Sequence, residues 1–314
     1  MMYTDTMENN NGYPIKVAAR MTGLTAHIIR AWEKRYQALV PKRTSGNRRI
    51  YSEQDIKKLN LLRDATSLGF RIGEIANNSI EQLEKLIEDA GGAKPSGGEK
   101  TGNISGHESA YVERAIRAIL DYDDAGLEEL LEKAMVDLGE VNVVEKVIVA
   151  LLQRIGDMWE SGEMRTSQEH MASAIIRTFI GNLISLNSDL SGAPHLLVTT
   201  PTSHVHENGA LVAAMIGSSD GWRVTYLGPD LPAEEIAAAA HRKNSRAVAL
   251  SLIYPADNPP LVAEIKKIRK LLPDGTFMVL GGHAAESYRP LLTDLNDVVI
   301  GDLADFRKLL RKLR

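Results

Sequence analysis

Two histidines lie close together on a predicted loop of the chain. His204 and His206 fall within residues 201–209, which end in Gly209. This segment follows an apolar run, 195–200, that is typical of a buried parallel strand, and a helical pattern comes after it. Open parallel sheets bind ligands at the carboxyl ends of their strands, and imidazole is a common metal ligand. The loop is therefore a candidate ligand site, although two histidines alone do not identify a metal.

Residues further along the chain give this loop a resemblance to a known domain. Strand-like runs are followed by Ser251 with Ile253, and later by the pair Gly281 and Gly282. The region resembles the cobalamin-binding Rossmann-like domain. The signature of that domain is an acidic residue, any residue, His, two residues and Gly, and a Ser-x-Leu-type motif and a Gly-Gly pair follow.

This resemblance implies a role for each matching residue. His206 would be the lower axial ligand of cobalt, and Gly209 completes the signature. The slot for the nucleotide tail would be formed by residues of the downstream motifs: Ser251, Ile253, Gly281 and Gly282. His204 stands at the acidic position, where a carboxylate would orient the ligand histidine, and an imidazole replaces that carboxylate only in part.

The elements around the loop predict a doubly wound fold. Five strand-like runs alternate with helical patterns, as in a flavodoxin-like sheet with right-handed crossovers: 195–200, 222–226, 246–251, 276–280 and 297–300. Before them, four helices joined by short loops suggest a bundle: 109–121, 124–137, 141–160 and 167–187. A Gly/Ser/Pro-rich stretch, 90–107, is typical of a flexible linker that lets the N-terminal part reorient.

Composition limits the class of protein. The chain has 314 residues, enough for two or three domains, and 44% of them are hydrophobic. It has no cysteine, which excludes disulfides and thiolate metal sites. The N-terminus lacks a signal-peptide pattern and no apolar run is long enough to cross a membrane, so we expect a cytoplasmic protein without a membrane partner.

Charge is distributed unevenly. Residues 13–78 contain 13 lysines and arginines against 5 acidic residues, a net charge of +8. Since the whole chain has a net charge of −4, the remainder carries −12. A basic head on an acidic body indicates a polyanionic partner for the head.

The head has the pattern of a winged helix-turn-helix. Residues 13–36 predict two helices joined by a tight turn at Gly23, with Thr25 as the N-cap of the second helix and Trp32 in the core. Residues 39–51 predict a hairpin that turns at 45–47 and serves as a wing, followed by a helix from Ser52 to about Leu68. In helix-turn-helix proteins, the second helix lies in the DNA major groove.

The block from Tyr13 to about Ala90 resembles the MerR-family DNA-binding domain. Its motifs include Val17-Ala-Ala, Thr22-Gly-Leu, Arg30-Ala-Trp-Glu-Lys-Arg-Tyr and Arg48-Arg-Ile-Tyr. The resemblance implies binding to double-stranded operator DNA through residues of the second helix and the wing: Thr25, His27, Arg30, Arg35, Lys42, Arg43, Arg48, Arg49 and Tyr51.

A further motif lies at one end of the predicted bundle. Trp159 is separated by nine residues from the pair Glu169 and His170. This spacing resembles the MerR-type, B12-dependent photoreceptor transcriptional regulators (the CarH/LitR group), in which it covers the upper face of cobalamin, against the adenosyl group. In members that switch to bis-histidine ligation, a histidine follows this tryptophan, whereas Glu160 stands here.

The resemblance implies a transcriptional repressor and not an enzyme. Its DNA affinity would depend on bound cobalamin, with adenosylcobalamin as the expected form. Light would be the signal, and a tetramer would be the DNA-binding state. The expected domains are a winged-helix domain, a linker, a four-helix bundle and a Rossmann-like domain: 12–89, 90–107, 108–190 and 191–314. A light-independent sensor of cobalamin or another tetrapyrrole is the first alternative. A corrinoid methyl-carrier is the second, although such an enzyme component has no need of a DNA-binding head.

Overall fold

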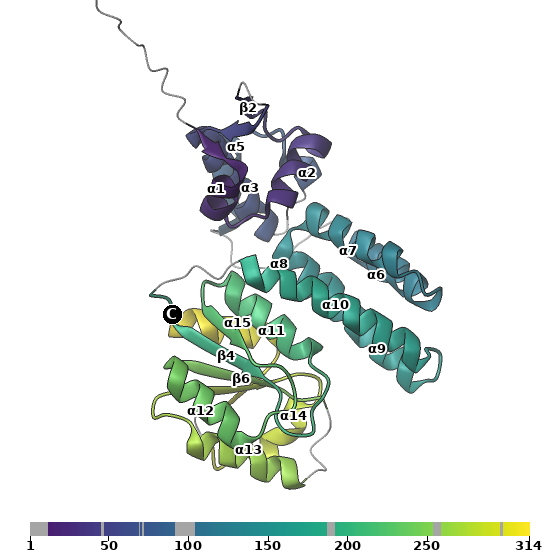
Figure 1. Ribbon diagram of the computed structural model, residues 1–314, viewed down its shortest axis with the longest axis vertical. Helices are drawn as coiled ribbons and strands as arrows, with labels where there is room; N and C mark the ends of the chain where they lie inside the picture. The colour runs from purple at the N-terminus through teal and green to yellow at the C-terminus, as the bar shows by residue number, and fades with distance from the viewer. Residues whose placement is uncertain are drawn as a thin grey trace, which may run out of the picture. The chain divides into compact units, whose positions relative to one another are not determined.

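The computed structural model describes residues 12–44, 47–68, 70, 72–91, 104–186, 192–253, 259–295 and 298–314. These residues form two compact units (Figure 1). The first unit consists of residues up to 113 together with 129–147, and the second of 114–128 and 148–314. Most of the predicted linker lies outside the described residues, while its two ends belong to helices α5 and α6.

The N-terminal residues of the first unit form the predicted winged helix-turn-helix. Three short strands make an antiparallel sheet of order β1-β3-β2, in which Arg43 pairs with Arg49. Thr25 caps α2 as predicted, and Ser52 forms a capping box with Asp55 at the start of α3. The elements are β1 (Tyr13–Pro14), α1 (Ile15–Thr22), α2 (Ala26–Tyr36), β2 (Lys42–Arg43), β3 (Arg49–Tyr51), α3 (Glu53–Ser67), α4 (Ile72–Ile75) and α5 (Ile80–Gly91).

The second helix of this motif also contacts residues 129–147, which the sequence did not predict. The Trp32 side chain is buried, and its Nε1 donates to the carbonyl oxygen of Val136 at 3.2 Å. The Tyr36 hydroxyl donates to Asp137 Oδ1 at 2.5 Å. α2 is therefore joined to residues of the predicted bundle and not only to its own domain.

The helical region follows the predicted pattern closely. Its helices are α6 (Ile104–Leu120), α7 (Asp124–Leu138), α8 (Glu140–Asn142), α9 (Val149–Glu160) and α10 (Thr166–Leu186). The single helix expected over 141–160 is instead interrupted by a π-helical segment, Val143–Ile148, a feature that often occurs at functional sites. Among the described residues, no helix combines the length and the hydropathy that a bilayer-spanning helix needs.

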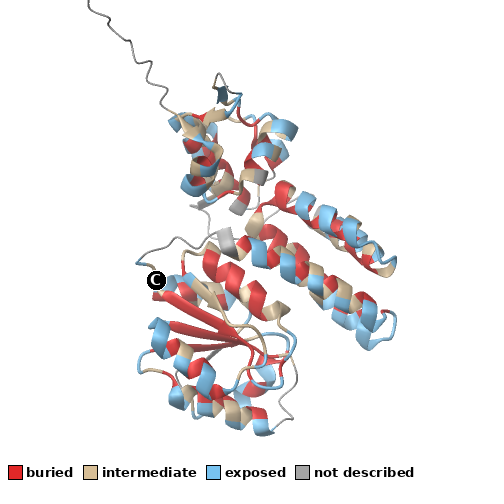
Figure 2. Ribbon diagram, viewed as in Figure 1, coloured by how far each residue is buried: buried red, intermediate tan, exposed pale blue. Residues whose placement is uncertain are grey.

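The C-terminal part of the second unit is the predicted doubly wound sheet. Its five parallel strands have the order β5-β4-β6-β7-β8, which is the flavodoxin-like order. β4 and β6 are buried along their whole length, as expected of strands covered on both faces (Figure 2). The strands are β4 (His195–Thr199), β5 (Arg223–Tyr226), β6 (Ala247–Ser251), β7 (Phe277–Gly281) and β8 (Val298–Ile300).

Helices cover both faces of this sheet. One face packs on α12 and α13, whose buried residues share a core with the central strands. The other face is covered by α11, which also contacts α10 of the helical region. The helices are α11 (Asn208–Ser219), α12 (Ala233–Lys243), α13 (Pro259–Leu271), α14 (Ala285–Tyr288) and α15 (Leu303–Leu313).

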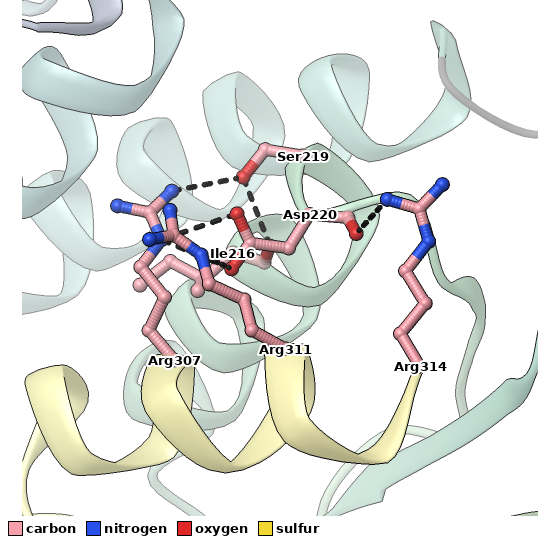
Figure 3. A network of polar contacts seen from close by, with 6 residues as sticks. All are labelled: Ile216, Ser219, Asp220, Arg307, Arg311 and Arg314. Carbon is pink, nitrogen blue, oxygen red and sulfur yellow. Dashed lines mark hydrogen bonds and ion pairs between the residues drawn. The ribbon is translucent and has the colours of Figure 1, made fainter. Parts of the chain in front are cut away.

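The last helix is fastened to the end of α11 by arginines. Figure 3 shows the Asp220 carboxylate facing Arg307 and Arg311. Asp220 Oδ2 lies 3.1 Å from Arg307 Nε and 3.5 Å from Arg311 Nε, and Arg314 Nη1 donates to the Asp220 carbonyl oxygen at 3.2 Å. Asp220 ends α11, where a carboxylate meets the negative end of the helix dipole. The arginines offset this unfavourable placement and hold α15 against the end of α11.

Candidate functional site

The loop after β4 lies where the strand order of the sheet reverses. β4 has β5 on one side and β6 on the other, and ligands bind in the crevice at such a switch point. The loop is held from below by Asp230: Ser203 N donates to Asp230 Oδ1 at 2.7 Å, and Asp230 N donates to Thr200 Oγ1 at 2.9 Å. The Thr200 hydroxyl in turn donates to the carbonyl oxygen of His204. The loop is thus shaped before any ligand arrives.

The two histidines of this loop have opposite environments. The His204 side chain is 1% exposed, and burial lowers its pKa, with a smaller contribution from the charge of His206. The His206 side chain is exposed. His206 is therefore the more exposed of the two histidines, and its role as the cobalt ligand stays a prediction from the sequence motif.

The downstream motif residues meet at the same edge of the sheet. Ser251 ends β6, and a Cβ at Gly209 would lie 2.6 Å from its Oγ. A Cβ at Gly282, where φ is +96°, would lie 2.5 Å from the carbonyl oxygen of Leu252. Gly281 ends β7 in register with Ser251. Four of the predicted residues thus lie together at this edge of the sheet and form what we call the cradle: Gly209, Ser251, Gly281 and Gly282. Ile253, half-buried, follows directly after Leu252.

The residues of this cradle are compatible with a bound nucleotide tail. Ser251 Oγ is buried and has no hydrogen-bond partner among the described residues. A buried hydroxyl normally has a partner, so an incoming polar group fits here. At Gly209 and Gly282 the backbone lies so close to Ser251 and Leu252 that a Cβ at either position would collide with them.

The predicted upper-face residues lie on α9 and α10. Trp159 is 50% exposed, and its Nε1 donates to Thr166 Oγ1 at 3.4 Å. Glu169 Oε2 lies 3.5 Å from Nε2 of the exposed His170. An indole with half its surface in solvent is an expected partner for a large flat ligand.

Side chains of α10 link this face to the His206 loop, which the sequence did not predict. Ser173 Oγ donates to Glu169 Oε1 at 2.7 Å and accepts from Asn208 Nδ2 at 3.1 Å. Arg177 Nη1 lies 3.2 Å from Glu207 Oε1. These residues form no recognisable sequence motif. The one signal in the sequence is that Glu207 and Asn208 directly follow His206.

The second candidate site is the exposed side of α2 and the wing. Arg30 and Arg35 on α2 are exposed, as are Lys42, Arg43 and Arg48 on the wing. Thr25 uses its hydroxyl to cap α2, accepting from Ile28 N at 3.0 Å. The backbone of His27 lies in α2, and its side chain is outside the described part of the chain. The exposed cations fit phosphate contacts.

One predicted DNA contact, Tyr51, is corrected by the structure, and another, Arg49, has a partner within the protein. Tyr51 is fully buried, and its hydroxyl donates to Glu33 Oε2 at 3.4 Å. Arg49 Nε lies 2.7 Å from the same oxygen. A side chain without exposed surface cannot contact DNA, so Tyr51 is not a DNA contact. The Arg49 side chain is 32% exposed, and its DNA contact stays a prediction. Both residues contact α2 through Glu33.

Comparison with known families divides the chain into three matched parts. Residues 13–78 match the MerR HTH family regulatory proteins. Residues 111–184 and residues 194–308 match two B12 binding domain families. The predicted bundle and sheet therefore each correspond to a B12-binding family, and the predicted fold class is confirmed.

Individual relatives have the same combination or the same fold. The chain is 29% identical to the HTH-type transcriptional repressor CarH of Myxococcus xanthus, over 88% of this chain and 91% of that protein. It is 27% identical to the HTH-type transcriptional repressor CarA of Myxococcus xanthus, over 76% of each. The monomethylamine corrinoid protein of Methanosarcina barkeri covers 66% of this chain with a TM-score of 0.53 and 17% identity, which is a likeness of fold. On these matches, the chain combines a MerR-type helix-turn-helix domain with two B12-binding domains.

Proposed function

We propose that this protein is a cobalamin-dependent transcriptional repressor, that adenosylcobalamin is its preferred ligand, and that light is its signal. The observation that carries the proposal is the cradle at the switch point of the sheet, with the exposed His206 beside it, in a chain that also has exposed cations on its wing. The similarity to two proteins named transcriptional repressors supports the regulatory role.

The chain's own residues divide the work of holding the ligand. His206 would supply the lower cobalt ligand, and Gly209, Ser251 and Gly282 would receive the nucleotide tail. Trp159 would cover the upper face, with Glu169 and His170 beside it. When bound, adenosylcobalamin supplies a light-sensitive Co–C bond.

The repressor role requires that ligand state changes DNA affinity. We propose that the protein binds its operator as an oligomer, most simply a tetramer, because joining several heads multiplies their affinity. The exposed Trp159, half of whose surface would be covered or uncovered with the ligand, is the side chain through which ligand state would alter association. The chain would then act as a regulator without catalysis of its own.

One experiment tests the whole proposal. Purified protein is mixed with adenosylcobalamin in darkness, and absorption spectra, gel filtration and operator-DNA binding are recorded before and after illumination. We expect a bound corrinoid spectrum, a larger particle and tight DNA binding only in darkness. Absence of a bound spectrum would refute cobalamin dependence, and identical behaviour after illumination would refute the light response.

A light-independent cobalamin sensor is favoured by one specific observation. Glu160, which follows Trp159, is exposed at the end of α9, where an imidazole would be needed for bis-histidine ligation after light. In that case the protein would release or bind DNA according to cobalamin concentration, and the illuminated and dark samples would give the same gel filtration profile.

A further inference from the structure

Glu207, directly after the proposed cobalt ligand, is engaged from two different elements. The Tyr226 hydroxyl donates to Glu207 Oε2, and Arg177 Nη1 lies 3.2 Å from Glu207 Oε1. Tyr226 ends β5, the strand beside β4, while Arg177 lies on α10. One carboxylate therefore ties the His206 loop both to the sheet and to the helix that carries Glu169 and His170.

The burial of these groups shows which contact matters. The Glu207 side chain is 17% exposed, and burial together with its hydrogen bond to Glu207 raises the pKa of Tyr226, so the phenol stays protonated and donating. A phenol-to-carboxylate bond out of water is a strong, charge-assisted hydrogen bond. The Arg177 side chain is 56% exposed, so its ion pair adds less.

The Glu207 carboxylate does not cap its own helix. Glu207 is the N-cap residue of α11, but its side chain makes no capping hydrogen bond. Its oxygens are both directed to residues distant in sequence. The neighbouring Asn208 makes a parallel tie, because its Nδ2 donates to Ser173 Oγ at 3.1 Å, and Ser173 donates to Glu169.

We propose that Glu207, held by Tyr226 and Arg177, is a positioning residue that fixes the His206 loop against α10 and so fixes the lower-ligand side of the cobalamin site relative to its upper face. We call the contacts of Glu207 with Tyr226 and Arg177 the clamp. The identity of the ligand rests on the proposed function, whereas the clamp is present in the ligand-free protein. It also supplies an acidic residue next to the ligand histidine in a chain where His204 occupies the usual acidic position. That carboxylate acts on the loop through Tyr226 and Arg177.

The clamp is tested with Tyr226→Phe, which removes one hydroxyl, Glu207→Gln, which removes the charge, and the double variant. The matched control is Asp294→Asn, which removes a carboxylate paired with Lys266 at 2.9 Å, in the loop that precedes β8 at the opposite edge of the sheet. Two quantities are measured in the full-length protein. They are the hydrogen–deuterium exchange of residues 202–208 without cobalamin, and the dissociation rate and spectrum of adenosylcobalamin in darkness.

We expect each single variant to speed exchange of this loop and dissociation of adenosylcobalamin by roughly tenfold, and to increase the base-off fraction of the spectrum. The double variant should add little to either single change, because both act through one hydrogen bond. Asp294→Asn should behave as the wild type. Arg177→Lys, which keeps the positive charge, should stay closer to the wild type in exchange and dissociation than Arg177→Ala.

Exchange and dissociation unchanged in both single variants would overturn the clamp. Faster exchange spread over the whole sheet would also overturn it, because that result describes general destabilisation and not positioning. A wild-type protein that binds no adenosylcobalamin would instead refute the proposed function, and the exchange of the ligand-free protein would still decide whether Glu207 fixes the loop.

Discussion

At the scale of single residues, burial distinguishes the two histidines of the loop, His204 and His206, which the sequence motif also assigned different roles. His204 is enclosed by its own loop, where desolvation lowers its pKa and favours the neutral form, whereas His206 points to solvent. A neutral, enclosed imidazole supports the loop by packing. The imidazole of His206, two residues later, lies at the protein surface.

Substitution of each histidine should therefore have a different result. His206→Ala should weaken cobalamin binding by more than about tenfold and shift the bound spectrum to the base-off form, because the proposed lower ligand is gone. His204→Ala should lower the thermal unfolding temperature instead, because it leaves a cavity in the loop. Absorption titrations and thermal unfolding of both variants make the comparison. A base-off spectrum in His204→Ala but not in His206→Ala would reverse the assignment.

Residue 160 should decide how firmly the illuminated protein keeps its cofactor. After light the cobalt needs another ligand, and the exposed Glu160 has no imidazole to offer. Cofactor should therefore be lost from the illuminated wild type, while Glu160→His should retain it. Retention is measured by absorption after illumination and desalting, with Glu163→His, an exposed glutamate beyond the end of α9, as the control. Full retention by the wild type would contradict this account.

At the scale of elements, the wing and α2 have separate tasks in DNA binding. The exposed Arg43 and Arg48 face solvent on the wing, while Arg49 is bound by Glu33. Arg43→Ala and Arg48→Ala should each weaken DNA binding at all sequences and reduce the slope of log affinity against log salt by about 0.9. Arg49→Ala should leave that slope unchanged and lower the stability of the head. Binding measured at four salt concentrations tests this, and equal slopes in all proteins would refute it.

The contact between α8 and α3 should make the first unit sensitive to pH. Asn142 Nδ2 donates to the Thr66 carbonyl oxygen at 2.6 Å, and burial raises the pKa of the nearby Glu140 from 4.5 to about 7, although the charge of Arg63 opposes the rise. Because the folded protein holds this proton more tightly than the unfolded chain, Glu140 contributes stability fully below pH 4.5 and loses it as pH rises through about 7.

Glu140→Gln should remove that dependence. The variant should be more stable than the wild type by on the order of 2 kcal/mol at pH 8, and the difference should vanish near pH 4. Urea unfolding at both values measures it, and Glu132→Gln, an exposed glutamate of α7, is the control. A wild-type advantage at pH 8 would contradict the predicted sign.

The elements themselves were largely predictable, and their contacts were not. Periodicity placed β4, β6 and the helices near their observed ends, because burial on both faces of a parallel sheet and amphipathic helices leave regular patterns. The cradle was predictable only through a motif. The contacts from Trp32 to Val136 and from Tyr226 to Glu207 join residues far apart in sequence and depend on the packing of finished elements, so no local pattern indicated them.

At the scale of the whole molecule, charge assigns DNA binding to one part of the chain. Residues 13–78 carry a net charge of +8 and the remainder −12, so the rest of the chain repels a polyanion while the head attracts it. A single head of this size contacts few phosphates, and its affinity should be modest at physiological salt. Tight, switchable binding therefore has to come from the number of heads that act together.

This reasoning gives a quantitative expectation for the light response. If darkness favours an oligomer and light separates it, apparent DNA affinity should fall by about 100-fold or more on illumination, while the intrinsic affinity of each head is unchanged. Mobility-shift titrations on an operator with two half-sites and on one with a single half-site separate these two effects. We expect a large light-dependent loss on the double site and almost none on the single site. His206→Ala, which should fail to load adenosylcobalamin, serves as the control that does not respond to light. An equal loss on both sites would mean that light changes the head itself, through the contacts of α2 with Val136 and Asp137, and not the number of heads.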